Sequence, residues 1–191
     1  MRSSLLVAAT FVIGALGHAR VLEPAPRKSG PVSAAACGTA VTKSLTADLA
    51  SPLEDAIRKQ DSEYNAAACE LYFCRGFKFD DNKSLVKKYT SGQVVPFRID
   101  MIARHTGYAN VSVIDLQAKK PIGSPLIYWP RYFDNTLGFP NWPKNETEFS
   151  VSIPSNLPSA CKTAGNCALQ WWWYAAYDNK QHYMNCIDFT V

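Results

Sequence analysis

The chain has 191 residues, a formal net charge of +4 at pH 7 and 47% hydrophobic residues, which suits one domain with a substantial core. Its lysines and arginines are scattered rather than gathered in a basic block, so we expect neither nucleic acid nor a membrane as a partner. Charged residues make up 19% and aromatic residues 12%, a balance that favours a β-rich domain over a helical one.

Residues 1–17 have the pattern of a secretory signal peptide. A positive charge precedes an apolar run from Leu5 to Leu16 that is too short to span a bilayer, and small residues end the segment. Cleavage after Gly17 leaves a single secreted, extracellular domain of residues 18–191 that begins with His18. An amino-terminal histidine has three donor nitrogens for a metal, its α-amine and two ring nitrogens, whereas an internal histidine has only the ring.

Residues 18–50 are predicted to be irregular, and a helix is expected after them. Proline and glycine rule out a long helix in residues 18–50, although Val21–Pro24 could form a short edge strand. Ser51 followed by proline and a carboxylate predicts the start of a helix that continues weakly to about Asn65.

The rest of the chain is predicted to be β-structure. Strands are expected at residues 95–101, 110–116, 149–153, 169–177 and 183–191. These short strands favour a mainly β protein, an immunoglobulin/fibronectin-like β-sandwich with long loops and a short helix, stapled by disulfides. The aromatic run of residues 169–177, which includes Trp171, Trp172 and Trp173, is predicted to lie in the core. Residues 118–148 form a long aromatic excursion, and a loop of that length is usually functional.

All six cysteines follow the predicted cleavage site, which favours three disulfides in a secreted chain. They are Cys37, Cys69, Cys74, Cys161, Cys167 and Cys186. Cys161 and Cys167 enclose a short loop with Gly and Asn for a turn, so we expect them to pair. The other four then tie the Cys37–Cys74 region to Cys186, in an order that the spacing leaves open.

Three N-x-S/T sequons are candidate N-glycosylation sites, at Asn82, Asn110 and Asn145. Asn110 lies in a predicted strand, which disfavours its modification.

The chain has only three histidines, His18, His105 and His182. His105 lies in a predicted turn between two strands, where with His18 it could complete a set of one amine and two imidazoles. Such a set suits copper, and binding should weaken in acid because each donor must be unprotonated. A lone histidine in a turn is more often solvated than a ligand, so the prediction depends on the pair.

The segment Gln181-His182-Tyr183 is predicted to place two functional side chains on one face of a strand. Residues i and i+2 share a face, so Gln181 and Tyr183 point one way and His182 the other. A tyrosine hydroxyl can take a long axial position at copper, and a glutamine beside it can hydrogen-bond the co-substrate. The alternatives are a core tyrosine, a solvated glutamine and a structural or surface role for His182.

Taken together, these motifs resemble the lytic polysaccharide monooxygenases. The resemblance rests on His18, on the turn His105-Thr106-Gly107 and on the pattern from Gln181 through Tyr183 to Cys186. The body of the chain is most similar to auxiliary activity family sixteen. The segments that carry this second similarity are Cys74-Arg75-Gly76, Ala109–Val113, Leu169–Trp173 and Cys186–Val191.

The resemblance implies oxidative cleavage of β-1,4-linked glycans by one copper ion, with O₂ or H₂O₂ as co-substrate. His18 and His105 would hold the metal, Tyr183 would be its axial residue, and Gln181 would position the co-substrate. Partners would be an insoluble polysaccharide surface and an electron donor, either a small reductant or a redox enzyme. Tyr108 is the best candidate for stacking on sugar near copper. Four further aromatic residues either extend such a platform or cover the core, namely Trp129, Tyr132, Phe139 and Trp142.

The predicted function is therefore a secreted, monomeric copper monooxygenase that oxidises cellulose at C1. The same chemistry on chitin or another cell-wall glycan is one alternative, and a non-catalytic copper- or polysaccharide-binding protein is another. Gln181 and Tyr183 favour the enzyme, because storage of copper requires neither. A glycoside hydrolase needs two facing carboxylates, and Asp80, Asp81 and Asp134 offer no convincing pair.

Overall fold

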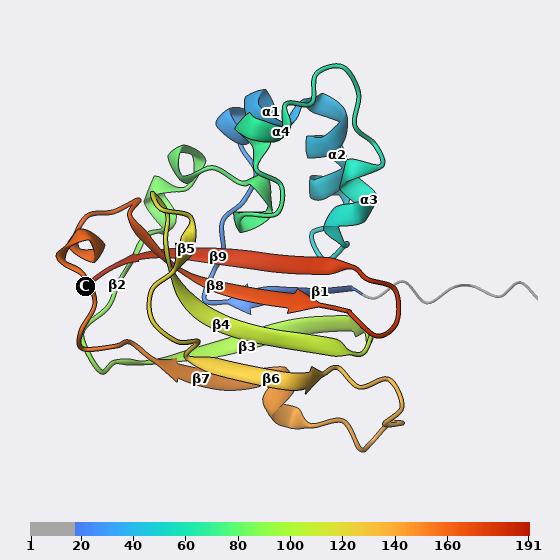
Figure 1. Ribbon diagram of the computed structural model, residues 1–191, viewed down its shortest axis with the longest axis vertical. Helices are drawn as coiled ribbons and strands as arrows, with labels where there is room; N and C mark the ends of the chain where they lie inside the picture. Colours follow the sequence, from blue (N-terminus) through green and yellow to red (C-terminus); the bar gives the residue numbers. More distant parts are fainter. Residues whose placement is uncertain (1–17) are drawn as a thin grey trace, which may run out of the picture.

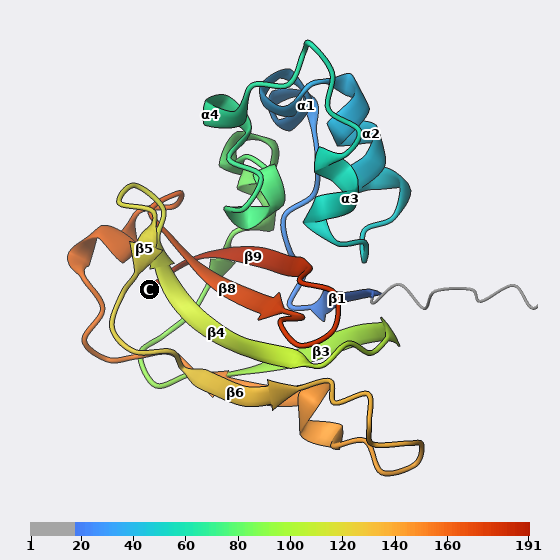
Figure 2. The same ribbon diagram turned by 45° about the vertical axis from the view of Figure 1, so that its right-hand side comes forward.

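The computed structural model describes residues 18–191, so the predicted signal peptide of residues 1–17 lies outside the described part. Two sheets face each other (Figures 1 and 2). The smaller has the order β1 (His18–Glu23), β3 (Val94–Ala103), β7 (Glu148–Ser152). The larger has the order β2 (Lys87–Lys88), β9 (His182–Thr190), β8 (Cys167–Tyr174), β4 (Gly107–Asp115), β5 (Lys120–Pro121), and β6 (Ile127–Tyr132) also pairs with β4. The predicted β-sandwich is confirmed.

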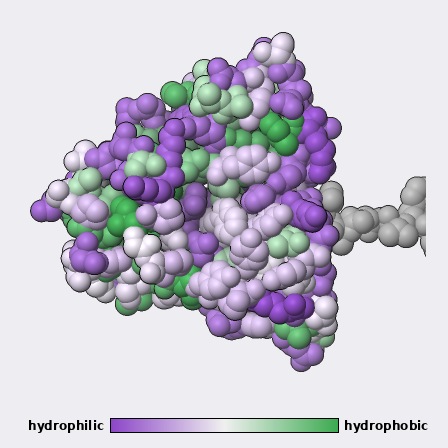
Figure 3. Space-filling view, viewed as in Figure 1, coloured by the Kyte–Doolittle hydropathy of each residue, from purple (hydrophilic) through white to green (hydrophobic). Residues whose placement is uncertain are grey.

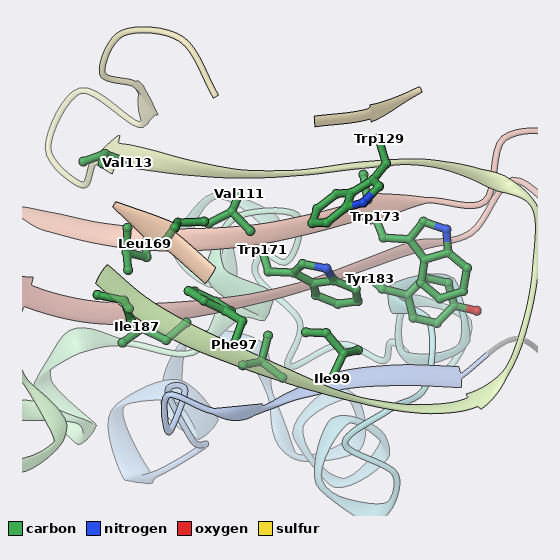
Figure 4. Close-up of a cluster of buried hydrophobic side chains, with 14 of the residues drawn as sticks. Phe97, Ile99, Val111, Val113, Trp129, Leu169, Trp171, Trp173, Tyr183 and Ile187 are labelled. Atoms are coloured by element: carbon green, nitrogen blue, oxygen red, sulfur yellow. The ribbon is translucent and has the colours of Figure 1, made fainter. Parts of the chain in front are cut away.

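Alternation along the strands builds the core between the two sheets. Phe97 and Ile99 of β3 face Trp171 and Trp173 of β8, and all four side chains are buried (Figure 4). Burying each large apolar side chain contributes roughly 1.5–3 kcal/mol to folding. Trp172, between the two buried tryptophans, points to the opposite face of the sheet and is only half-buried. The five strands predicted after residue 90 are all present.

A layer of short helices covers the outer face of the six-stranded sheet over β9 (Figure 2). Its members are α1 (Pro31–Cys37), α2 (Thr39–Ala47), α3 (Leu53–Ile57) and α4 (Ala66–Cys69). Their apolar residues form a second cluster against Met184 of β9. The irregular structure expected for residues 18–50 is therefore wrong after residue 30.

The helix starts depend on contacts that the sequence pattern did not show. Asp81 accepts hydrogen bonds from the backbone N–H of Val32 (3.0 Å) and of Ser33 (2.7 Å), so a remote carboxylate caps α1. Ser51 does not cap α3, because its hydroxyl donates to Asp48 O (2.8 Å) and Pro52 occupies the N-cap position. The helix expected from Ser51 to Asn65 is accordingly only five residues long.

The six cysteines form three disulfides. Cys161–Cys167 closes the predicted local loop, Cys37–Cys69 joins α1 to α4, and Cys74–Cys186 ties the helical layer to β9. The long excursion of residues 118–148 is not a plain loop, because it contains β5 and β6. Short 3-10 helices occur at Cys74–Gly76, Phe79–Asp81, Lys83–Leu85, Lys144–Glu146 and Ser159–Lys162. Within residues 18–191, no helix has the length and apolar character needed to cross a membrane.

Candidate metal centre

Strand register brings His18 and His105 to the same end of the sandwich. His18 pairs with Ala103 across β1 and β3, and His105 follows in the connection from β3 to β4. Figure 1 shows the start of β1, this connection and the β8–β9 connection together at one end. The two histidines therefore lie at the same end of the sandwich because their strands pair, although they are 87 positions apart in the sequence (105 − 18).

The His18 ring is held between a carboxylate and the protein interior. Its Nδ1 lies 2.7 Å from Asp48 Oδ2, while its Nε2 is buried and has no hydrogen-bond partner within the described residues. The backbone N–H of Ala19 donates to Ala50 O (3.1 Å), which fastens β1 to the loop after α2. The start of β1 is thus bonded to β3 on one edge and to the loop after α2 on the other.

A buried arginine supports that same loop. Arg75 donates from Nη1 to Ser51 O (2.8 Å) and from Nη2 to Asp48 O (3.0 Å), and it is almost fully buried. Burial lowers the pKa of the Arg75 guanidinium to about 10, with the nearby Asp48 and Tyr183 opposing that effect. It therefore remains a cation at neutral pH and holds the loop whose Asp48 contacts His18.

The His105 turn is anchored by Asp178 from the β8–β9 connection. Asp178 Oδ2 accepts hydrogen bonds from the backbone N–H of Thr106 and from Asn135 Nδ2 (2.8 Å), and lies 3.5 Å from His105 Nδ1. Both His105 ring nitrogens are buried without a hydrogen-bond partner among the described residues. Gly107 completes the turn, because a Cβ there would collide with the backbone of residues 174 and 175.

Gln181 and Tyr183 meet as the strand pattern predicts. The Tyr183 hydroxyl donates to Gln181 Oε1 (2.8 Å), and its ring stacks on Trp173 with centroids 4.1 Å apart. Burial raises the pKa of the Tyr183 hydroxyl far above its ordinary value, so it stays a neutral phenol. His182 points the other way, with Nδ1 2.7 Å from Glu54 Oε1, which confirms its structural role.

The histidines have the properties that a copper site requires. Buried imidazole nitrogens without a partner are costly, and both ring nitrogens of His105 are of this kind among the described residues. No group of three His, Cys, Asp or Glu side chains in residues 18–191 could hold a metal ion. The predicted cleavage after Gly17 would free the α-amine of His18 as a donor beside the two imidazoles. The residues present fit copper bound by two imidazoles and one amine.

The structure separates the aromatic candidates into two groups. Trp129 and Tyr132 are buried in the core, so their proposed place on a sugar platform is wrong. Phe139 is 81% and Trp142 37% exposed, and they contact each other at the tip of the loop after β6. Tyr108 is half-buried on the outer face of the larger sheet rather than on this loop, packed against rings of β8.

A buried ion pair joins this loop to the His105 turn. Arg104 Nη1 lies 2.6 Å from Glu146 Oε2, and the arginine also lies over the rings of Phe133 and Trp142. Sequence reasoning missed this pair, along with Asp48 and Asp178, and it gave Arg75 no role beyond the segment Cys74-Arg75-Gly76. The partners of these residues are remote in the chain, so no local motif indicated the contacts.

The chain matches the model of one known protein family. The family model described as "Lytic polysaccharide mono-oxygenase, cellulose-degrading" matches residues 18–189, beginning at His18 itself. The chain belongs to this family of lytic polysaccharide monooxygenases. The family is copper-dependent and includes polysaccharide-active oxidoreductases as well as non-catalytic binding domains.

One solved structure similar to this chain is a chitin binding domain from Burkholderia pseudomallei. It has a TM-score of 0.45 and 14% sequence identity, over 91% of this chain and 98% of that chain. No curated protein matches the chain in sequence. Members of the family are typically secreted, and three disulfides are consistent with an extracellular protein.

Proposed function

We propose that the chain, cut after Gly17, is a secreted and monomeric copper monooxygenase that oxidises cellulose at C1. The observation that carries the proposal is that β1 places His18 opposite Ala103, at the end of the sandwich where both ring nitrogens of His105 are buried without a partner among the described residues. At the same end, Gln181, just before β9, accepts a hydrogen bond from Tyr183. Within the family, we infer auxiliary activity family sixteen from the similarity of the four segments given in the sequence analysis. The single domain is residues 18–191.

Each residue has a distinct part in the proposed mechanism. His18, through its α-amine and one ring nitrogen, and His105, through one ring nitrogen, would hold one copper ion. Copper supplies the one-electron chemistry that a strong C–H bond requires, using an external electron donor and O₂ or H₂O₂. Tyr183 would face the copper as a neutral phenol, because burial raises the pKa of its hydroxyl. Its hydroxyl fixes Gln181 Oε1, which sets the direction in which the Gln181 amide donates to the co-substrate.

The polysaccharide would lie across the end of the sandwich. Phe139 and Trp142 present exposed rings on the loop that Arg104 and Glu146 fasten to the His105 turn. Sugar rings pack their C–H faces on such aromatic surfaces. Tyr108 remains a weaker candidate for this contact, since it lies on the outer face of the sheet.

Two alternatives keep the site and change its use. Chitin or another cell-wall glycan would be cleaved by the same chemistry. A non-catalytic binding protein would retain the fold, but would not need the Gln181–Tyr183 hydrogen bond next to the histidines.

Product analysis decides among these readings. The protein beginning at His18 should be loaded with copper and incubated with a reductant on cellulose and on chitin in parallel. Aldonic-acid oligosaccharides from cellulose are expected, and their loss on metal chelation is the control. Oxidised products from chitin alone would change the proposed substrate from cellulose to chitin. Unoxidised products, or none, would refute the proposed monooxygenase activity.

Copper binding tests the amine donor separately. One glycine added before His18 should lower copper affinity by about 100-fold or more, roughly 2.7 kcal/mol, because the chelating amine becomes an amide. Titration calorimetry compares this form with the protein beginning at His18. Equal affinities would show that the α-amine is not a ligand.

A further inference from the structure

Three aromatic rings surround one asparagine on the outer face of the six-stranded sheet. Asn110 of β4 pairs with Trp172 of β8 on one side and with Tyr128 of β6 on the other. Residues directly opposite on neighbouring strands share a face, with Cβ atoms about 4.5–5.5 Å apart. Tyr108, two residues before Asn110, points to the same face. We call Tyr108, Tyr128 and Trp172 the Asn110 face.

The Asn110 face is open to solvent. Tyr128 is 55% exposed, and Asn110, Tyr108 and Trp172 are half-buried. The helical layer covers β9 and reaches only Trp172. The space-filling view shows a pale area below that layer, the colour of weakly polar residues such as tyrosine and tryptophan (Figure 3). The rings therefore form an amphipathic surface with no covering element among residues 18–191.

The amide oxygen of Asn110 accepts a hydrogen bond, whereas its amide nitrogen is accessible for attachment of a sugar. Ser112, the hydroxyl residue of the sequon, donates from Oγ to Asn110 Oδ1 (2.9 Å). Asn110 Nδ2 makes no hydrogen bond within the described residues and is not among the buried unpartnered atoms, so solvent reaches it. Ser112 therefore fixes Oδ1 of Asn110, and Nδ2 remains accessible for a bond to a sugar.

The other two sequons provide internal contrasts. Asn82 is 1% exposed, and its Nδ2 donates to Lys28 O (2.9 Å) and Lys78 O (2.8 Å), so a sugar there is incompatible with the fold. Asn145 is exposed in the 3-10 helix Lys144–Glu146, where a sugar is accommodated without specific contacts.

We propose that Asn110 carries an N-linked glycan whose first sugar packs on the Asn110 face. A bond forms between Nδ2 and C1 of the sugar, the bond from C1 to phosphate of a lipid-diphosphate donor breaks, and Nδ2 loses one proton. The C–H faces of the sugar cover the rings of Tyr128, Trp172 and Tyr108, while its hydroxyls face water. This inference rests on the proposed secretion of the chain and not on its copper chemistry.

The same assignment changes how Tyr108 is interpreted. Polysaccharide packed on the outer face would compete with a sugar fixed at Asn110, so Tyr108 becomes part of the glycan seat. The exposed rings of Phe139 and Trp142 are then left as the contacts for substrate.

Glycopeptide mass spectrometry of the whole chain, secreted from a eukaryotic host that performs N-glycosylation, tests the attachment. We expect glycan on Asn110 and Asn145 and none on Asn82 in the folded protein. An unmodified Asn110 overturns the proposal, and so does a glycan on Asn82, because burial would then not predict modification. The result is independent of copper loading, so it separates this proposal from the enzymatic one.

A double-mutant cycle tests the contact with the rings. Glycans are trimmed enzymatically to the first sugar, and Asn110→Gln is compared with Tyr128→Ala and with the double variant. Tyr128 is chosen because it is exposed and has no ring partner among the described residues. Loss of the sugar should lower the thermal midpoint by about 2–4 °C, and by less than half of that when Tyr128 is absent.

Asn145→Gln is the matched control, and its effect should be small and independent of Tyr128. If Asn110→Gln lowers the thermal midpoint equally with and without Tyr128, the proposed packing of the sugar on the Asn110 face is overturned. Loss of cellulose binding on Tyr128→Ala in protein without glycans assigns the face to polysaccharide instead, and likewise overturns it.

Discussion

Nδ1 of His18 lies 2.7 Å from Oδ2 of Asp48, so the ring nitrogen nearest the backbone is already in contact with a carboxylate. The α-amine and Nδ1 of one histidine can bind a single metal as a chelate, whereas Nε2 lies on the far side of the ring. Copper held by that chelate must therefore take Nδ1 from Asp48. The Asp48 side chain is 41% exposed, so water can solvate the released carboxylate.

Asp48→Asn should leave the copper affinity of the protein beginning at His18 nearly unchanged. An ion pair this exposed is worth about 0–1 kcal/mol, or about fivefold in affinity at most. The asparagine retains an acceptor for the N–H of Ala50, which Asp48 Oδ1 serves at 2.9 Å. Titration calorimetry measures the affinity, with His105→Ala as the comparison that should bind far more weakly. A loss above tenfold on Asp48→Asn would make Asp48 a ligand.

Asp178→Ala should weaken copper binding by about 10–100-fold, the usual cost of losing a group that orients a metal ligand. The substitution removes the acceptor for Thr106 N–H and Asn135 Nδ2, and the carboxylate 3.5 Å from His105 Nδ1. The electron paramagnetic resonance spectrum of bound Cu(II) should also change, which a purely structural role would not require.

Asp80→Ala is the matched control for Asp178→Ala. Asp80 is an exposed carboxylate paired only with Lys83 in the same 3-10 region, so its loss should leave both affinity and spectrum unaltered. If the Asp178→Ala protein binds copper with wild-type affinity, Asp178 does not orient His105 and only joins the two loops.

Asp188→Ala should destabilise the fold by about 3–5 kcal/mol, because it leaves the buried cation of Arg27 without its partner. Arg27 donates from Nε (2.7 Å) and Nη2 (2.6 Å) to the two Asp188 oxygens, and both side chains are buried. Denaturant unfolding measures the loss, and Lys83→Ala, which breaks an exposed pair, should cost at most about 1 kcal/mol. Comparable losses from both variants would contradict the burial argument.

Acid should reduce the contribution of Asp81 to stability. Burial alone would raise the pKa of Asp81, but hydrogen bonds from Ser33 and from the N–H groups of Val32 and Ser33 hold it below its ordinary value of 3.8. Because the pKa of Asp81 is lower in the folded state than in the unfolded state, its carboxylate stabilises the fold. This stabilisation is complete above the pKa of the unfolded state and is lost as the pH falls through the pKa of the folded state.

Asp81→Ala should therefore cost about 1 kcal/mol near pH 7, as expected for a helix cap, and progressively less below pH 4. Unfolding curves of both proteins at pH 7, 4 and 3 give the difference. A difference that stays constant across that range would show that the charge of Asp81 contributes nothing.

Local patterns in the sequence were enough to predict the sandwich and part of the site. Alternating residues such as those around Phe97 indicated the strands, because the side-chain period of two is a property of the strand itself. The same rule placed Gln181 and Tyr183 on one face, and their hydrogen bond follows from it. Cys161 and Cys167 could be paired because the loop between them is short.

Tertiary structure alone decided which distant residues act together. The pairing of His18 with Ala103, the cap that Asp81 places on α1 and the anchoring of Thr106 by Asp178 join segments far apart in the chain. It also decided that Trp129 is buried in the core and Phe139 is exposed to solvent, although both are aromatic residues of the segment 118–148. Such contacts depend on sheet register and on burial, which composition and short motifs do not encode, because one strand can pair with several others until the whole core is packed.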